Sequence, residues 1–151
     1  MPVRTLTNKS TALRVLLVDD NSAGLGARCM VLEELGYDTL GVTCPLEALA
    51  TFRKQPFDLV VTDYKMPHMT GRELIAELRK IEPLLPIILI SGYAEPLGLT
   101  EKNTGATVVI MKSANEVQHL VRAVKRVLTL KVQRKPSASE APKARRKTAA
   151  S

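Results

Sequence analysis

Short apolar runs alternate along this chain with stretches that have the spacing of an amphipathic helix. Four runs have the length and composition of buried strands, and a fifth, more polar run suits the edge of a sheet; the five cover residues 15–18, 37–42, 59–62, 87–90 and 108–111. Between them, apolar residues recur at intervals of three and four. Strands that alternate with helices imply βαβ units, so the pattern predicts an α/β fold with a doubly wound parallel sheet.

Local signals place the ends of the helices. Asn21 or Ser22 can cap the first helix, whose apolar positions include Leu25, Met30, Val31, Leu32 and Leu35 and which ends before Gly36. The second is expected from Pro45 to Pro56, with Leu46, Leu49 and Phe52 on one face. The third and the last are expected at about residues 70–81 and 115–130, where apolar residues again keep helical spacing.

The fourth helix has the weakest pattern. Residues 95–104 contain Pro96 and Gly98, which both disfavour a helix interior. A short, irregular helix or loop is one interpretation, and a segment that reshapes itself when a neighbouring pocket is occupied is the other. We favour the short, irregular element.

Chemically useful side chains follow four of the five strands. Asp19 and Asp20 come after the first strand, Asp63 after the third, Ser91 after the fourth and Lys112 after the fifth. Parallel strands share one carboxyl edge, where ligands of such sheets bind. Taken singly, such aspartates often only cap a helix, and a lone serine or lysine is usually a solvated loop residue. Together they predict a pocket that binds a divalent cation and a phosphoryl group.

Length and composition are those of one ordinary domain with tails. The chain has 151 residues, of which 45% are hydrophobic, which is ample for a core. No apolar run approaches the ~20 residues that span a bilayer, and the N-terminal segment has no secretory signal pattern. Cys29 and Cys44 lack metal-ligand spacing. We therefore expect a cytoplasmic protein without a disulfide.

Positive charge is concentrated at the C-terminus. Residues 131–151 carry seven basic side chains and one acid, or +6 of the net +7, which leaves +1 for residues 1–130. We expect a flexible segment at 1–12, a folded domain at 13–130 and a disordered basic tail at 131–151. The tail is either a solubilising linker or an electrostatic arm for nucleic acid or an acidic partner. The tail has no aromatic residue for base stacking, so we expect at most weak, nonspecific contact with nucleic acid.

Several sequence motifs carry a family resemblance. They are the acidic pair in Leu16-Leu17-Val18-Asp19-Asp20-Asn21, the block from Asp58 to Gly71 (DLVVTDYKMPHMTG), the step Ile90-Ser91-Gly92, and Lys112. Over residues 13–130 the chain resembles the receiver domain of two-component response regulators. This resemblance implies a flavodoxin-like (βα)5 fold with strand order 2-1-3-4-5.

The resemblance also implies a role for each site residue. Asp63 corresponds to the phosphoacceptor, which takes a phosphoryl group from the histidine of a histidine kinase or phosphotransfer protein. Lys112 would pair with a phosphate oxygen and Ser91 would donate a hydrogen bond to another. The chain would then signal by changed binding of an output partner, rather than by turning over a substrate.

A magnesium ion belongs to the family pattern. By resemblance its ligands would be side-chain oxygens of Asp20 and Asp63, the backbone carbonyl of Lys65, and Asp19 mainly through water. Mg²⁺ takes oxygen ligands and keeps some of its waters, which suits a cluster of carboxylates beside a phosphoryl group.

Two positions depart from the family pattern. Ser113 follows Lys112 where proline is usual, and Val109 stands where a switch aromatic is common. A receiver-like scaffold that binds its partner without phosphorylation is therefore an alternative interpretation. A phosphoryl-transfer enzyme of the aspartyl-phosphate type is disfavoured, because Lys65 occupies the place of its second aspartate. No second folded domain is expected after Leu130, so a stand-alone receiver is the favoured interpretation.

Overall fold

The fold is built on a five-stranded parallel sheet. The structure is a computed structural model that describes residues 12–92 and 98–134. The strands are β1 (Arg14–Val18), β2 (Asp38–Val42), β3 (Leu59–Asp63), β4 (Ile87–Ser91) and β5 (Val108–Met111), in the order β2-β1-β3-β4-β5. Every neighbouring pair is parallel, and the more polar strand β2 lies at an edge. The predicted fold and strand order are confirmed.

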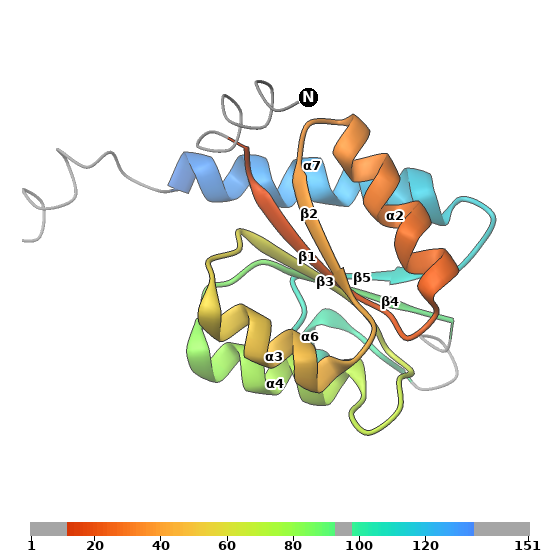
Figure 1. The fold of residues 1–151 in the computed structure, drawn as a ribbon, viewed down its shortest axis with the longest axis vertical. Coiled ribbons are helices and arrows are strands. Elements are labelled where there is room, and N and C mark those ends of the chain that lie inside the picture. Colours follow the sequence, from red (N-terminus) through yellow and green to blue (C-terminus); the bar gives the residue numbers. More distant parts are fainter. Residues whose placement is uncertain (1–11, 93–97, 135–151) are drawn as a thin grey trace, which may run out of the picture.

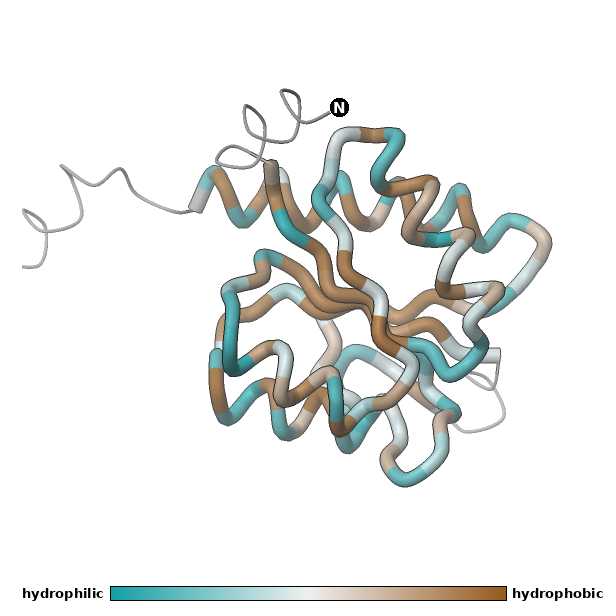
Figure 2. The backbone as a smooth tube through the Cα atoms, in the orientation of Figure 1, coloured by the Kyte–Doolittle hydropathy of each residue, from teal (hydrophilic) through white to brown (hydrophobic). Residues whose placement is uncertain are grey.

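Helices cover both faces of the sheet (Figure 1). Helices α2 (Ser22–Glu34) and α7 (Glu116–Arg134) lie on one face. Helices α3 (Pro45–Lys54), α4 (Gly71–Ile81) and the short α6 (Glu101–Thr104) lie on the other. Because side chains of a strand alternate between its faces, each face has its own apolar cluster, and the central strands are mostly apolar (Figure 2).

The helix ends follow the signals of the sequence. Asn21, rather than Ser22, caps α2, and its side chain accepts a hydrogen bond from the N–H of Gly24. Beyond that helix Gly36 has φ 100°, with its N–H bonded to the Glu33 carbonyl, which is the left-handed ending that favours glycine. Thr70 and Glu73 form a reciprocal capping box at the start of α4.

Some predicted apolar faces are wrong in detail. Met30, Leu35, Leu46 and Val117 are exposed, although each is an apolar residue within a helix that the apolar spacing predicts. In α2 the buried residues are Leu25, Arg28 and Leu32, so an arginine takes the inward position between two leucines. Three- and four-residue spacing allows more than one apolar stripe, and packing against the sheet selects one of them.

In the C-terminal half, one predicted helix is only partly described and another extends beyond its predicted end. The described part of the predicted fourth helix contains the four-residue α6, and residues 93–97 lie outside the described residues, so the choice between the two interpretations of residues 95–104 stays a prediction. Helix α7 continues to Arg134, four residues beyond the predicted end. Lys131, assigned to the tail, places its Nζ 3.4 Å from Asp58 Oδ1, which anchors this last turn.

The remaining domain boundaries stay predictions. Residues 1–11 and 135–151, which contain most of the predicted N-terminal segment and basic tail, lie outside the described residues. Among the residues that are described, no helix is both long enough and apolar enough to span a membrane.

Gly71 allows the close approach of α4 to the end of β3. Its N–H donates to the Tyr64 carbonyl at 2.7 Å. A Cβ at this position would overlap the carbonyl oxygen of Asp63 and lie 2.8 Å from Leu89 Cδ1. We expect Gly71→Ala to lower the free energy of unfolding by about 1–3 kcal/mol, as overpacking typically does.

Gly26→Ala is the matched control for urea denaturation. Gly26 is an exposed residue of α2, and a Cβ there meets nothing within 4 Å. Replacing a helical glycine by alanine should raise stability by up to about 1 kcal/mol. Equal effects of the two substitutions would contradict the steric role of Gly71.

Candidate functional site

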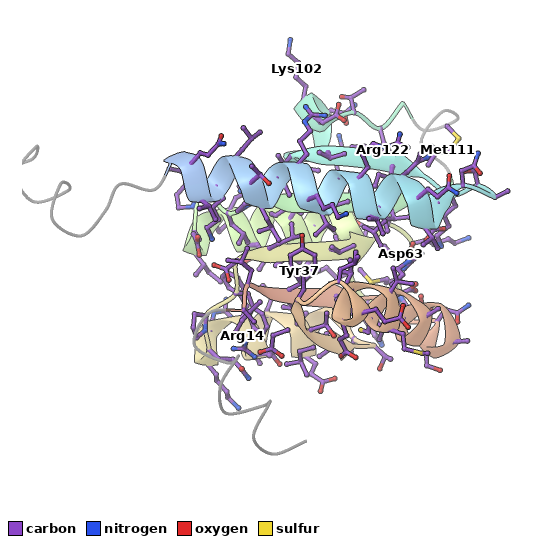
Figure 3. All side chains as sticks on the ribbon, turned by 90° about the horizontal axis from the view of Figure 1, so that it is seen from above. Arg14, Tyr37, Asp63, Lys102, Met111 and Arg122 are labelled. Atoms are coloured by element: carbon purple, nitrogen blue, oxygen red, sulfur yellow. The ribbon has the colours of Figure 1, made fainter. Side chains whose placement is uncertain are left out.

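The carboxyl edge of the sheet brings the predicted site residues together. One carboxylate oxygen each from Asp19, Asp20 and Asp63 lies within 4.8 Å of the other two. Asp19 and Asp63 are buried, whereas Asp20 is exposed, so the cluster opens to solvent on one side. Asp63 and Arg14 mark opposite ends of the sheet in Figure 3.

Lys112 reaches the same pocket from the end of β5. Its Nζ lies 2.8 Å from Asp63 Oδ1, and its backbone N–H donates to the carbonyl of Ser91 at 3.0 Å. Ser91 is buried at the end of β4. The described peptide bonds are all trans, including the one between Lys112 and Ser113. Serine in place of proline therefore does not keep the ammonium away from Asp63.

The carboxyl group of Asp63 is held in an unfavourable environment. Burial raises the pKa of Asp63 above its ordinary value, and the negative charge of Asp19 raises it further. The hydrogen bond and charge of Lys112 and the charge of Arg28 act in the opposite direction, but the net pKa shift is upward. Ionised Asp63 is thus a buried anion that gains from any additional positive charge.

Arg28 and Glu116 are parts of this region that sequence reasoning missed. Arg28 Nη1 lies 2.7 Å from Asp19 Oδ2, and Arg28 Nη2 lies 2.7 Å from Oε2 of Glu116, the first residue of α7. A signal was present in the sequence, because Arg28 stands three residues after Leu25 and four before Leu32. A charged residue at an inward position of an amphipathic helix requires a partner.

The donor set suits a hard divalent cation. Three carboxylates, one of them exposed, offer oxygen ligands and leave room for the waters that Mg²⁺ retains. Lys65 is exposed in the loop after β3, and the role of its backbone carbonyl as a ligand remains a prediction. The residues present therefore fit Mg²⁺.

The raised pKa makes Asp63 a cost to stability. When the pKa of an acid is raised in the folded state, the folded protein loses stability as the pH rises from the ordinary pKa of aspartate through the raised pKa. We expect Asp63→Asn to raise the free energy of unfolding by about 0.5–2 kcal/mol at neutral pH without divalent cations. The gain should shrink in acid, where the wild-type carboxyl is already neutral.

Asp20→Asn is the control for this denaturation series. Its carboxylate is exposed, so its removal should change stability less than the removal of Asp63. A loss of stability in Asp63→Asn at neutral pH would mean that the Lys112 ion pair outweighs burial and repulsion.

Comparison with solved structures gives the same fold at high similarity. A CheY-like response regulator receiver domain protein from Methanospirillum hungatei is 31% identical, with a TM-score of 0.76, over 83% of this chain and 100% of that one. The response regulator protein TrrA from Thermotoga maritima, solved in complex with Mg²⁺-BeF, is also 31% identical, with a TM-score of 0.68. That match covers 76% of this chain and 97% of TrrA.

Sequence relatives include much longer proteins. The sensor histidine kinase GacS of Pseudomonas protegens is 38% identical over 98 residues, which are 62% of this chain and 10% of the kinase. The chain thus spans about a tenth of that relative.

The family model of the response regulator receiver domain matches residues 15–125. Receiver domains are phosphoacceptor modules of two-component systems that bind Mg²⁺ at an acidic pocket and interact with histidine kinases or phosphotransfer proteins. The matched segment contains all five strands, except for the first residue of β1, and every residue of the acidic pocket described above, including Lys112. This chain belongs to the response regulator receiver domain family.

Proposed function

We propose that this chain accepts a phosphoryl group on Asp63 from a histidine kinase or phosphotransfer protein, and signals through changed binding of an output partner. The observation that carries the proposal is the convergence of three carboxylates with the Lys112 ammonium, 2.8 Å from Asp63, at one edge of the sheet. Phosphoryl transfer depends mostly on positioning and on stabilisation of charge, and this edge offers both.

Each side chain has a defined task in this proposal. The Asp63 carboxylate attacks the phosphorus, the bond from phosphorus to the imidazole nitrogen of the donor breaks, and an acyl phosphate forms. The Lys112 ammonium, which pairs with Asp63 before the reaction, can turn to a phosphoryl oxygen. Ser91, at the end of β4, would donate its hydroxyl to another phosphoryl oxygen.

Mg²⁺ would be held by the carboxylates of Asp20 and Asp63, by the backbone carbonyl of Lys65, and by Asp19 through a water molecule. When bound, the ion supplies positive charge that lets an anionic phosphoryl group approach a cluster of carboxylates. The exposed position of Asp20 supports direct ligation by its carboxylate. Asp19 is already bonded to Arg28 and to the backbone N–H of Asn21, which supports a role through water.

Binding of a partner without phosphorylation is the second candidate function. It is favoured by Val109, which has no aromatic ring and whose N–H donates to the Glu101 carboxylate at 3.0 Å. An enzyme with turnover remains disfavoured, because Lys65 stands two residues after Asp63. A cytoplasmic location, the output partner and weak nucleic-acid contact by residues 131–151 stay predictions.

Phosphorylation should be confined to Asp63. Treatment of the full chain with acetyl phosphate and Mg²⁺ should add one phosphoryl group to the wild type and none to Asp63→Asn, as read by intact mass. Asp58→Asn is the control, because Asp58 lies at the opposite end of β3, bonded to Arg14 and Lys131, and should leave the mass gain unchanged.

The outcomes separate the candidate functions. A mass gain that survives in Asp63→Asn would contradict the assignment of the phosphoacceptor. Wild-type protein that gains no mass would favour the phosphorylation-independent scaffold.

Mg²⁺ binding should depend on Asp20 more than on Asp19. We expect Asp20→Asn to weaken binding on the order of tenfold or more, since even outer partners of metal ligands typically contribute that much. Asp19→Asn should weaken binding less and should lower stability, because it leaves the buried Arg28 with one partner fewer. Calorimetric titration with Mg²⁺, followed by denaturation, measures both effects. Equal losses of affinity would count against direct ligation by Asp20.

A further inference from the structure

The guanidinium of Arg28 joins the acid pocket to the last helix. Its side chain is 8% exposed and lies between Asp19, which is 3% exposed, and Glu116, which is 16% exposed. Three of its contacts are 2.7–2.8 Å long, one to Asp19 and two to the same oxygen of Glu116. Contacts this short and this sheltered from solvent are weakly screened, so a change at one end is felt at the other.

Arg28 already acts as a counter-ion of the pocket. Asp19 Oδ2 accepts from Arg28, while Asp19 Oδ1 accepts from the N–H of Asn21 at 3.0 Å. Both oxygens of this buried carboxylate are thus bonded, and its charge is balanced by an arginine from α2. A divalent cation drawn to the same cluster must share Asp19 with that guanidinium.

Glu116 offers the guanidinium a second site of attachment. It is the first residue of α7, where an acidic side chain is also stabilised by the helix dipole. Loss of the bond from Arg28 to Asp19 would leave Glu116 as the one acidic partner of the guanidinium among the described residues. The balance of Arg28 between the two carboxylates therefore depends on what occupies the pocket.

We propose that Arg28 is a resident counter-ion of the acid pocket that is displaced toward Glu116 when a divalent cation binds, so that α7 senses occupancy of the site. The proposal rests on the proposed function, because it requires a cation at Asp19, Asp20 and Asp63. It assigns Arg28 as a positioning residue and gives the signal a route to α7 that needs no aromatic side chain at Val109.

The first test is calorimetric titration of the full chain with Mg²⁺ alone. Arg28→Gln removes the competing cation and should tighten Mg²⁺ binding by about three- to tenfold, as expected for one charge several ångströms away. Glu116→Gln leaves Arg28 with Asp19 as its one remaining partner among these carboxylates and should weaken binding. Unchanged affinity in both variants would overturn the proposal.

Matched controls separate this local effect from net charge. Lys80 and Glu77 form an exposed ion pair toward the C-terminal end of α4, whereas the other end of that helix, at Gly71, lies beside Asp63. Lys80→Gln and Glu77→Gln repeat the two charge changes and should leave affinity unchanged. Controls that reproduce the shifts of the pocket variants would overturn a local role for Arg28.

The second test follows α7 directly. In ¹⁵N-labelled protein, Mg²⁺ should shift the backbone amide resonances of Glu116 and the following turn in the wild type but not in Arg28→Gln. Arg28→Lys keeps the charge but loses the forked contact, so its affinity should stay near that of the wild type while the response of α7 is lost. This variant also keeps the test decisive if Arg28→Gln fails to fold.

The outcomes distinguish this inference from the proposed function. Equal α7 shifts in the wild type and the Arg28 variants would overturn the route through Arg28 and leave phosphorylation of Asp63 intact. Failure of the wild type to bind Mg²⁺ at all would overturn both this inference and the proposed metal site.

Discussion

Negative charge that is forced together at one edge of a parallel sheet is the constraint on which this structure depends. Every strand points the same way, so the residues that end β1 and β3 meet, and two of their three carboxylates are buried. The rest of the site offsets that repulsion. Lys112 approaches from β5 and Arg28 from α2, and the raised pKa of Asp63 shows that the compensation is incomplete. A pocket with this excess of negative charge is suited to bind a cation, and with it a phosphoryl group.

The site residues could be predicted because topology alone determines where they meet. Strand ends can be recognised in a sequence, and a parallel sheet brings them to a common edge whatever lies between them. Asp63, Asp19 and Lys112 were found in this way. Arg28 could not be placed by the same reasoning, because helical spacing shows which residues can face the core but does not identify the partner of a charged one.

Apolar spacing alone also failed to predict which helix residues are buried and where α7 ends. Met30 and Leu46 are apolar and correctly spaced, yet they face solvent because the sheet accepts only one stripe of each helix. The end of α7 depends on Lys131, whose ammonium reaches Asp58, a residue 73 positions away in the sequence. A contact between residues so far apart in the sequence cannot be predicted from the residues near position 130, so local sequence does not show where α7 ends.

The packing of α7 has a consequence for how the protein is made. Its residues Leu120, Val124, Val127 and Leu128 complete the apolar cluster that covers one face of β1 and β3. During synthesis the five strands emerge before α7, and this face stays partly uncovered until α7 leaves the ribosome. The second carboxylate partner of Arg28, Glu116, is synthesised 88 residues after Arg28 itself. The pocket therefore becomes complete only after α7 has been synthesised, and a chain that stops before α7 presents neither a finished core nor a finished site to a partner.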